Sequence, residues 1–166
     1  MESEKKLSQA LTKNGAGASR EQVKALQAAM LNMPQAPGMD TDHFFIGGMY
    51  CRKIMIPKGI VIVSKTHKTD HFFIGCMGEL HIAGQGDNFV LRSGDIVPSP
   101  KGTKRVVYAI TDVVVLTIHK TDKTQADDDL EMEMVEVETI DLYDINNQPK
   151  PVVLVDESDK PKMEQK

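Results

Sequence analysis

Five histidines are the residues best suited to chemistry in this chain of 166 residues. His67 and His71 stand close together, and a third imidazole, from His81 or His119, can complete a three-nitrogen metal site with them. Imidazole nitrogen is a common ligand of zinc, iron, nickel and copper. The alternative is a set of histidines without a metal, hydrogen-bonded to Asp70. The sequence therefore predicts His67 and His71 as the candidate metal ligands.

Cationic side chains near these histidines favour a different ligand. Lys65, His67 and Arg105 can form a pocket for a small anion, because a planar guanidinium binds carboxylate or phosphate oxygens in pairs. Tyr108 would add an apolar wall, but it lies three residues after Arg105 and should face the opposite side of a strand. In the alternative interpretation Arg105 forms an ion pair inside the domain, with Glu79 or with an acid of the C-terminal segment.

Other catalytic arrangements have little support in the sequence. Glu79 has no second carboxylate beside it with which to share acid–base work. Cys51 and Cys76 lie in no Cys-x-x-Cys or other nucleophile motif, and we expect them to be small core residues. Phosphate-binding loops, the Gly-x-Ser-x-Gly motif and the dinucleotide fingerprint are absent from the sequence. A binding site is therefore favoured over these forms of catalysis.

Short β-type segments must position these residues. Strands are expected near 43–46, 49–56, 60–65, 71–76, 79–83, 88–91, 95–97, 104–110 and 112–119, separated by turns rich in glycine and proline. Many short strands without an intervening helix indicate an all-β sandwich or barrel. The heptapeptide Thr-Asp-His-Phe-Phe-Ile-Gly occurs twice, at 41–47 and 69–75. It marks two equivalent strands, or the reuse of one good strand sequence.

The two ends of the chain differ from this middle part. A capping box, Ser-Arg-Glu-Gln at 19–22, predicts the start of a helix. The apolar residues that follow share one helical face: Val23, Leu26, Met30 and Met33. We therefore expect a helical arm and linker over 1–40, the barrel over 41–123 and an acidic C-terminal extension over 124–166. A short helix near 126–134 and a strand at 152–155 are expected in the extension.

Charge is divided unevenly along the chain. Residues 43–123 carry eleven basic and six acidic side chains, whereas residues 124–166 carry four basic and thirteen acidic ones. The two segments can attract each other within one chain or between copies. The acidic extension disfavours nucleic acid as a partner. No apolar run approaches the roughly 18 residues of a membrane span. With two cysteines and no signal peptide, a cytoplasmic protein is expected.

The segment from Gly59 to Ala109 resembles the cupin superfamily. Cupins carry a first motif, Gly-x5-His-x-His-x3,4-Glu-x6-Gly, and a second motif, Gly-x5-Pro-x-Gly-x2-His-x3-Asn. Gly94, Pro100 and Gly102 match the turn of the second motif, and the first is matched loosely. The resemblance implies a double-stranded β-helix, which is a jelly-roll-like barrel, with ligand-binding positions that point into its mouth.

The departures from these motifs bear on the cofactor. Lys65 stands at the first histidine of the first motif, His67 keeps the second, and His71 falls on the glutamate. Arg105 replaces the histidine of the second motif and Ala109 its asparagine. The usual set of three histidines and one glutamate is not reproduced, and Arg105 would repel a cation. No cofactor is therefore expected, and a divalent metal at His67 and His71 is the alternative.

Within the cupins, the runs 101–112 and 117–122 are similar to small cupin-like proteins of tailed bacteriophages and prophages. The similarity extends over residues 50–122 and implies a non-catalytic protein. Such a protein would form a homo-oligomer, or dock on other viral structural proteins, through its arm and tail, in the host cytoplasm or in the virion. The alternative is a cupin enzyme, of the isomerase or dioxygenase kind, that binds a small molecule or a metal in the barrel mouth. The eroded ligand set favours the first hypothesis.

Overall fold

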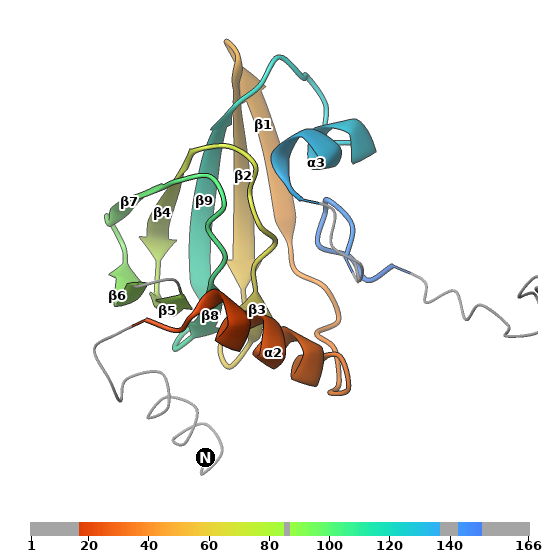
Figure 1. Cartoon of the computed structure of the whole chain (residues 1–166). Coiled ribbons are helices and arrows are strands. Elements are labelled where there is room, and N and C mark those ends of the chain that lie inside the picture. The colour runs from red at the N-terminus through yellow and green to blue at the C-terminus, as the bar shows by residue number, and fades with distance from the viewer. Residues whose placement is uncertain (1–16, 85–86, 137–142, 151–166) are drawn as a thin grey trace, which may run out of the picture.

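The computed structural model describes residues 17–84, 87–136 and 143–150, and its strands form two antiparallel sheets (Figure 1). The larger sheet has the strand order β1-β2-β9-β4-β7, and the smaller has the order β3-β8-β5-β6. The strand bounds are β1 Thr41–Ile46, β2 Met49–Ile56, β3 Val61–Val63, β4 His71–Met77, β5 Glu79–Gly84, β6 Asp87–Arg92, β7 Ile96–Ser99, β8 Val106–Ala109 and β9 Val113–Lys120. The prediction of an all-β, jelly-roll-like barrel is confirmed.

The turns and strand ends lie close to the glycine- and proline-rich turns that the sequence predicts. Gly94 and Gly102, from the second motif, adopt φ of 90° and 80°, which side chains other than glycine rarely tolerate. Strand β8 is shorter than the predicted 104–110, because the backbone N–H of Arg105 donates to the hydroxyl of Ser64 at 2.9 Å. The Ser64 hydroxyl thus takes the place of a backbone carbonyl as the acceptor for Arg105, and β3 ends at Val63, directly before Ser64.

The interior of the barrel changes character along its length. On β9 every second residue is buried: Val113, Val115, Thr117 and His119. The aliphatic end of this row packs against buried residues of β5, such as Leu80, in one hydrophobic cluster. Because side chains alternate along a strand, the same inward face of β9 passes from valine to threonine to histidine. One end of the barrel is therefore an apolar core, and the other presents polar side chains to the interior.

Helix α2 (Arg20–Met30) lies across one end of the barrel, beside β3 and β8 (Figure 1). The predicted capping box is present, since Ser19 and Gln22 each accept a hydrogen bond from the other's backbone. Val23 is fully buried, so the apolar face of the helix packs on its own chain. Met33 is 55% exposed and lies beyond the helix end, so the predicted stripe is shorter than expected.

The C-terminal extension folds back on the barrel. Helix α3 (Asp128–Met134) begins after Asp127, whose carboxylate accepts a hydrogen bond from the N–H of Leu130 at 3.0 Å. This N-cap explains why the helix starts two residues later than predicted. The buried residues of a second hydrophobic cluster join the extension to β2: Tyr50, Leu130, Met134, Val135 and Ile145. The strand predicted at 152–155 lies outside the described residues.

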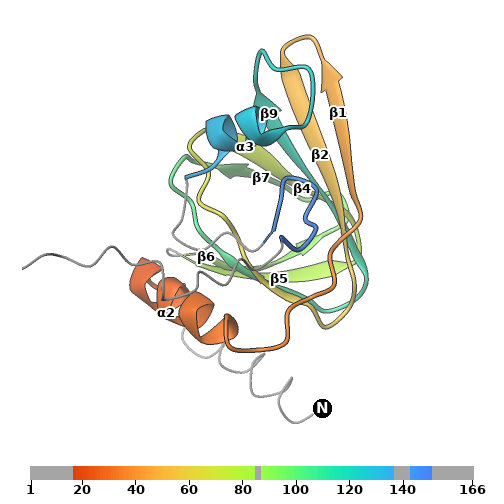
Figure 2. The same ribbon diagram turned by 90° about the vertical axis from the view of Figure 1, so that its right-hand side faces the viewer.

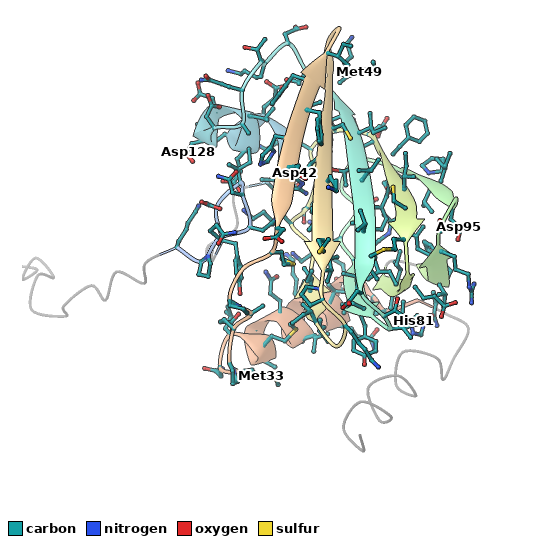
Figure 3. The ribbon with its side chains drawn as sticks, turned by 180° about the vertical axis from the view of Figure 1, so that it is seen from behind. Met33, Asp42, Met49, His81, Asp95 and Asp128 are labelled. Atoms are coloured by element: carbon teal, nitrogen blue, oxygen red, sulfur yellow. The ribbon has the colours of Figure 1, made fainter. Side chains whose placement is uncertain are left out.

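The outer face of the five-stranded sheet is apolar as well (Figure 3). The register places Phe44, Cys51, Ile118, Phe72 and Pro98 in one row that crosses all five strands. Seven large apolar side chains on this face are exposed: Phe44, Ile46, Met49, Met55, Phe72, Met77 and Ile96. A solvated antiparallel sheet usually carries polar residues on its outer face. We call this surface the outer apolar face.

The repeated heptapeptide accounts for part of that face. Its two copies form β1 and the start of β4, which lie in one sheet on either side of the β2–β9 pair. Phe44 and Phe72 are equivalent residues of the two copies, and they are 53% and 49% exposed. The cysteines depart from the prediction: Cys51 is half-buried and Cys76 exposed, so neither is a core residue. Among the described residues, no helix is long and apolar enough to cross a membrane.

Candidate functional site

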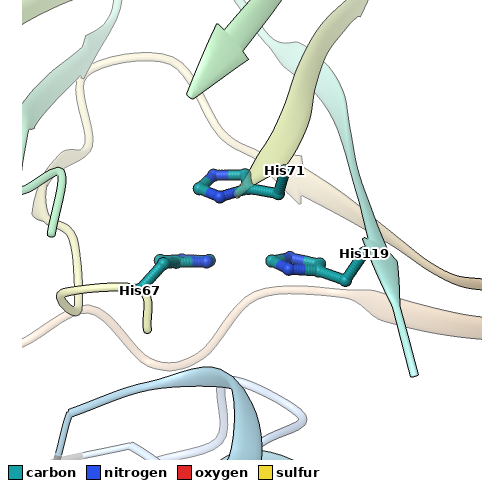
Figure 4. Close-up of side chains that lie close together, drawn as sticks. All are labelled: His67, His71 and His119. Atoms are coloured by element: carbon teal, nitrogen blue, oxygen red, sulfur yellow. The ribbon is translucent and has the colours of Figure 1, made fainter. Parts of the chain in front are cut away.

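Three imidazoles meet inside the polar end of the barrel (Figure 4). His71 is the first residue of β4, His119 lies near the end of β9, and His67 comes from the loop before β4. Each offers one ring nitrogen, and these three atoms lie within 4.8 Å of one another. The ring centroids are 4.1 Å apart for His67 and His71, 4.7 Å for His71 and His119, and 5.1 Å for His67 and His119. We call these residues the histidine cluster.

Two members of the histidine cluster are held by the sheet, and the third is held by the extension. The neighbouring strands β4 and β9 pair directly, with Phe72 opposite Ile118, so His71 and His119 enter the barrel from the same sheet. His67 instead forms an isolated β-bridge with Val135, which follows α3. The loop and the extension are joined on both sides of this bridge, since Glu136 N–H donates to Thr66 O and Lys68 N–H to Met134 O, each at 2.8 Å.

Burial keeps the cluster uncharged at neutral pH. Desolvation is the main cause that lowers the pKa of His67 well below its ordinary value of 6.5. Desolvation and the neighbouring His71 lower the pKa of His119 to about 3, and desolvation also lowers that of His71. The guanidiniums of Arg52 and Arg105 act in the same direction on His67. Neutral imidazole has the free lone pair that metal coordination needs.

A large cavity opens onto the histidine cluster. Its volume is about 780 Å³, and its lining includes His67, His71 and Thr117 together with aliphatic residues from both sheets. Residues of α2, of α3 and of the segment 143–150 line it as well, and Figure 2 shows α3 and that segment beside the open side of the barrel. A volume of this size is typical of pockets that enclose a small organic ligand.

Three residues that line the cavity each have a buried polar atom without a hydrogen-bond partner in the described part of the chain: Arg52 Nε, His67 Nδ1 and Thr117 Oγ1. Buried polar atoms are nearly always bonded in native proteins, so these atoms call for a partner that the described residues do not provide. The free Nδ1 of His67 is what a metal ligand requires. The residues present therefore fit a metal ion.

The predicted anion-binding residues all line this cavity, but in different settings. Lys65 forms an ion pair with Glu131 of α3 and donates to the carbonyl of Tyr143 at 3.0 Å. Arg105 donates through Nη1 to the hydroxyl of Ser99 at 2.6 Å. The positive charge of Lys65, which seemed unfavourable for a cation in the motif, thus has an acidic partner from the extension.

The structure resolves the alternatives left by the sequence. His119, not His81, joins His67 and His71, because His81 lies on β5 in the other sheet with its Nε2 3.2 Å from the Asn88 amide oxygen. Glu79 accepts a hydrogen bond from Arg92 Nε at 3.0 Å. Tyr108 does not line the cavity, in agreement with its predicted orientation away from Arg105.

Two cavity residues escaped the sequence prediction. Arg52 and Thr117 face each other across the β2–β9 ladder, and both point inward. The alternation of side chains along β2 indicated this position. Tyr50 and Ile56 are buried, and Arg52 lies an even number of residues from both, so its side chain points to the same face of the sheet. Without the strand pairing, a lone arginine in an apolar strand could not be assigned to the inside.

Comparisons with known proteins concern the barrel. No protein-family model matches the sequence, and no curated protein matches it. Similar folds occur among solved structures, such as a cupin superfamily protein from Desulfitobacterium hafniense, with 14% identity over 57% of this chain and 87% of that one and a TM-score of 0.47. An RmlC-like cupin from Shewanella frigidimarina is 20% identical over 54% of this chain and 82% of that one, with a TM-score of 0.46.

A third similar structure is KdgF from Halomonas sp., with 17% identity over 59% of this chain and 88% of that one and a TM-score of 0.48. These likenesses concern the fold of the barrel alone. Two antiparallel sheets, in the orders given above, enclose the cavity of this jelly-roll-like barrel. What the barrel does must be argued from its own side chains, because one fold serves many unrelated activities.

Proposed function

We propose that the chain is a metal-dependent cupin in which the histidine cluster binds one divalent transition-metal ion beside a small-molecule cavity. The observation that carries this proposal is the convergence of three ring nitrogens within 4.8 Å of one another, two of them on His67 and His71, which line a cavity of about 780 Å³. Imidazole ligands suit zinc, iron, nickel and copper. Three protein ligands leave coordination positions vacant, as in catalytic rather than structural sites.

The residues around the cluster support this function in different ways. Thr69 Oγ1 lies 3.4 Å from Nδ1 of His119, and the Thr69 carbonyl lies 3.3 Å from Nδ1 of His71, so both rings have a second partner that orients them. Such outer contacts are typical of metal-binding histidines. When bound, the metal would act as a Lewis acid that polarises an oxygen atom of a cavity ligand. The chain itself would orient that ligand and exclude water.

The metal proposal is tested by metal analysis of the full chain purified without chelator. We expect about one equivalent of transition metal per chain, by mass spectrometry of the elements. His67→Gln and His119→Gln should each reduce it to background. His81→Gln is the matched control, because that histidine is buried but lies outside the cluster. Absence of stoichiometric metal after exposure to zinc, iron, nickel and copper would overturn the proposal, as would equal loss in the control.

A second function, self-assembly, is favoured by the outer apolar face. We propose that a second copy of the chain covers this face. Seven side chains that expose on the order of 100 Å² each present about 700 Å², which is close to the roughly 800 Å² per partner of a standard interface. Among the described residues of this face, Lys53 forms an ion pair with Asp42 at 2.9 Å, at the β1 edge. An uncharged partner of the same shape fits such a surface.

This second proposal places the contact on the sheet instead of the arm and tail. The described parts of both ends pack on their own barrel, through the fully buried Val23 and Leu130. Two copies related by a two-fold axis would bring each apolar row against its equivalent. Docking on other viral structural proteins, and a place in a phage particle, stay predictions of the sequence resemblance.

A further inference from the structure

Arg52 occupies an unusual position for a charged side chain. It lies in the middle of β2, and its neighbours of the same parity, Tyr50 and Ile54, also face the interior. Its Nε is buried without a hydrogen-bond partner. The side chain of Arg52 is partly buried, and a buried guanidinium nitrogen is costly unless an acceptor lies beside it. The position of Arg52 therefore calls for an anionic acceptor within the cavity.

Thr117 presents the same deficiency on the neighbouring strand. Register pairs Arg52 with Thr117 directly, and the hydroxyl of Thr117 is also buried without a partner. Two hydrogen-bond donors without acceptors thus lie side by side on the same inward face. A carboxylate has two oxygens and can accept from both donors at once.

Charge in the cavity adds to this preference. Arg105 also lines the cavity, directly before β8 of the smaller sheet. The lining therefore contains a second guanidinium besides that of Arg52. The acidic group that influences Arg52 is Glu131, and this carboxylate is already bound to Lys65 and lies 3.9 Å from Lys150.

The other acids on the cavity lining do not cancel this charge. Glu136 lies 3.5 Å from Arg20 of α2, and Asp128 is exposed at the start of α3. The described part of the cavity therefore has more basic than acidic side chains. Attraction to an anion should be strong where water is largely excluded.

The rows of the ladder show how a ligand would lie. Ile54 pairs with Val115, Arg52 with Thr117, and Tyr50 with His119. The inward face of β2 and β9 thus changes from aliphatic, to two unpartnered donors, to the histidine cluster. More aliphatic residues line the cavity: Ile56, Ile60, Ile62 and Val107. Phe73 of β4 lies opposite Thr117, in the row of the two donors, and lines the cavity as well. The order of these rows matches a molecule with an apolar body and one acidic group.

We propose that Arg52 and Thr117, with Arg105 on the opposite side of the cavity, bind the carboxylate of a small apolar acid. The carbon skeleton of this acid lies against the aliphatic rows, and its carboxylate lies next to the histidine cluster. The inference deepens the proposed function by naming its ligand class. It rests on that function only for what happens to the acid once it is bound, because the guanidinium and the hydroxyl that bind it do not depend on a metal.

The test uses benzoate and hexanoate as probes and their neutral amides as controls. Binding to the full chain is measured by calorimetry and by the rise in melting temperature. We expect both acids to bind and both amides to bind at least tenfold more weakly. Arg52→Met, which keeps the side-chain volume without the charge, should weaken the acids at least tenfold, and Thr117→Val several-fold. Arg92→Met is the matched control, since Arg92 is exposed and pairs with Glu79.

The experiment is run on chelator-treated wild-type protein and on His119→Gln protein as well. Acid binding that persists in both supports the anion site even if the metal proposal fails. Stoichiometric metal without preference for acids over amides overturns the anion site alone, as does unchanged affinity in Arg52→Met. Arg52→Met removes a buried charge and should not unfold the barrel. Thr117→Val tests the same site independently should that variant not fold.

Discussion

Burial favours the neutral form of His67, His71 and His119, and the neutral form is the one that can coordinate a metal ion. Free imidazole is partly protonated near pH 6.5, whereas desolvation holds the pKa of His67 and His119 well below that value and also lowers the pKa of His71. A neutral ring does not have to lose a proton before it binds a metal. The same burial makes the metal-free protein sensitive to acid.

We expect the metal-free protein to lose stability as the pH falls below about 6.5. The folded state holds His119 with a pKa of about 3 and His67 with a pKa well below 6.5, whereas the unfolded chain titrates near 6.5. Between these values the unfolded state binds more protons, so the free energy of unfolding rises with pH and is lost as the pH falls. Each such histidine contributes at most about 1.4 kcal/mol per pH unit.

Urea unfolding of chelator-treated protein at pH 7.5, 6.0 and 5.0 checks this expectation. The slope with pH should be smaller in His119→Gln, which has one buried histidine fewer. A wild-type free energy of unfolding that does not change across this range would contradict the desolvation of the cluster.

At the residue scale the sequence predicted part of the site. The spacing of Lys65, His67, His71 and Arg105 against the cupin motifs predicted four positions that do line the cavity. It did not predict Arg52, and it could not choose between His81 and His119. Both choices depend on which strands pair and which faces meet, and these are properties of the whole sheet that local alternation does not contain.

At the scale of elements, α3 brings the acid that balances Lys65. Glu131 of this helix forms an ion pair with Lys65. Lys65 itself lies two residues before His67 in the sequence. The basic barrel and the acidic extension predicted from composition therefore interact within one chain, at the rim of the candidate site. The motif comparison alone made Lys65 an argument against a cation, because it did not include the extension.

Glu131→Gln should weaken metal binding by roughly tenfold, or about 1.4 kcal/mol. Lys65 would keep its charge near the histidine cluster but lose the carboxylate that offsets it, and a like charge disfavours a bound cation. Competition titration with a chromophoric chelator measures the affinity. Glu133→Gln is the control on the same helix, since Glu133 bonds Thr121 instead. Equal affinities of wild type and Glu131→Gln would show that the ion pair has no role at the site.

The elements themselves were largely predictable. Turn residues and alternation predicted nine strands near their observed places, and the capping box predicted the start of α2. The predicted strand bounds were wrong where a side chain takes the place of a backbone acceptor, as the Ser64 hydroxyl does before β8. Such exchanges depend on residues far apart in the sequence, 41 positions in this case.

At the scale of the whole molecule, the larger sheet carries apolar side chains on both faces. One end of its inner face builds the core, and its outer face exposes Ile46 to 75% of its full area. Exposed apolar surface of this extent favours association. The two copies of the heptapeptide each supply a phenylalanine to the outer apolar face, Phe44 and Phe72, so the repeat serves the surface as much as the interior.

We expect the wild-type protein to be a dimer at micromolar concentration and Phe72→Lys to be a folded monomer. A charge in the middle of an apolar interface is left unpaired in the dimer but is solvated in the monomer. Analytical ultracentrifugation measures the mass. Met132→Lys is the control, because Met132 is 53% exposed on α3, away from the sheet. A wild type that stays monomeric at high concentration would overturn the second-copy proposal.

The bridge between His67 and Val135 gives the C-terminal extension a share in the candidate metal site. Two ligands stand on the rigid sheet, whereas the third belongs to a loop that is bonded to the end of α3. By reciprocal linkage, anything that loosens the extension must raise the dissociation constant of the ion, and a bound ion must hold the extension in place by the same factor. A bound ion would then join the C-terminal extension to the larger sheet. Whether the site holds an ion would therefore be detectable away from the histidines, in how firmly the extension packs over the cavity.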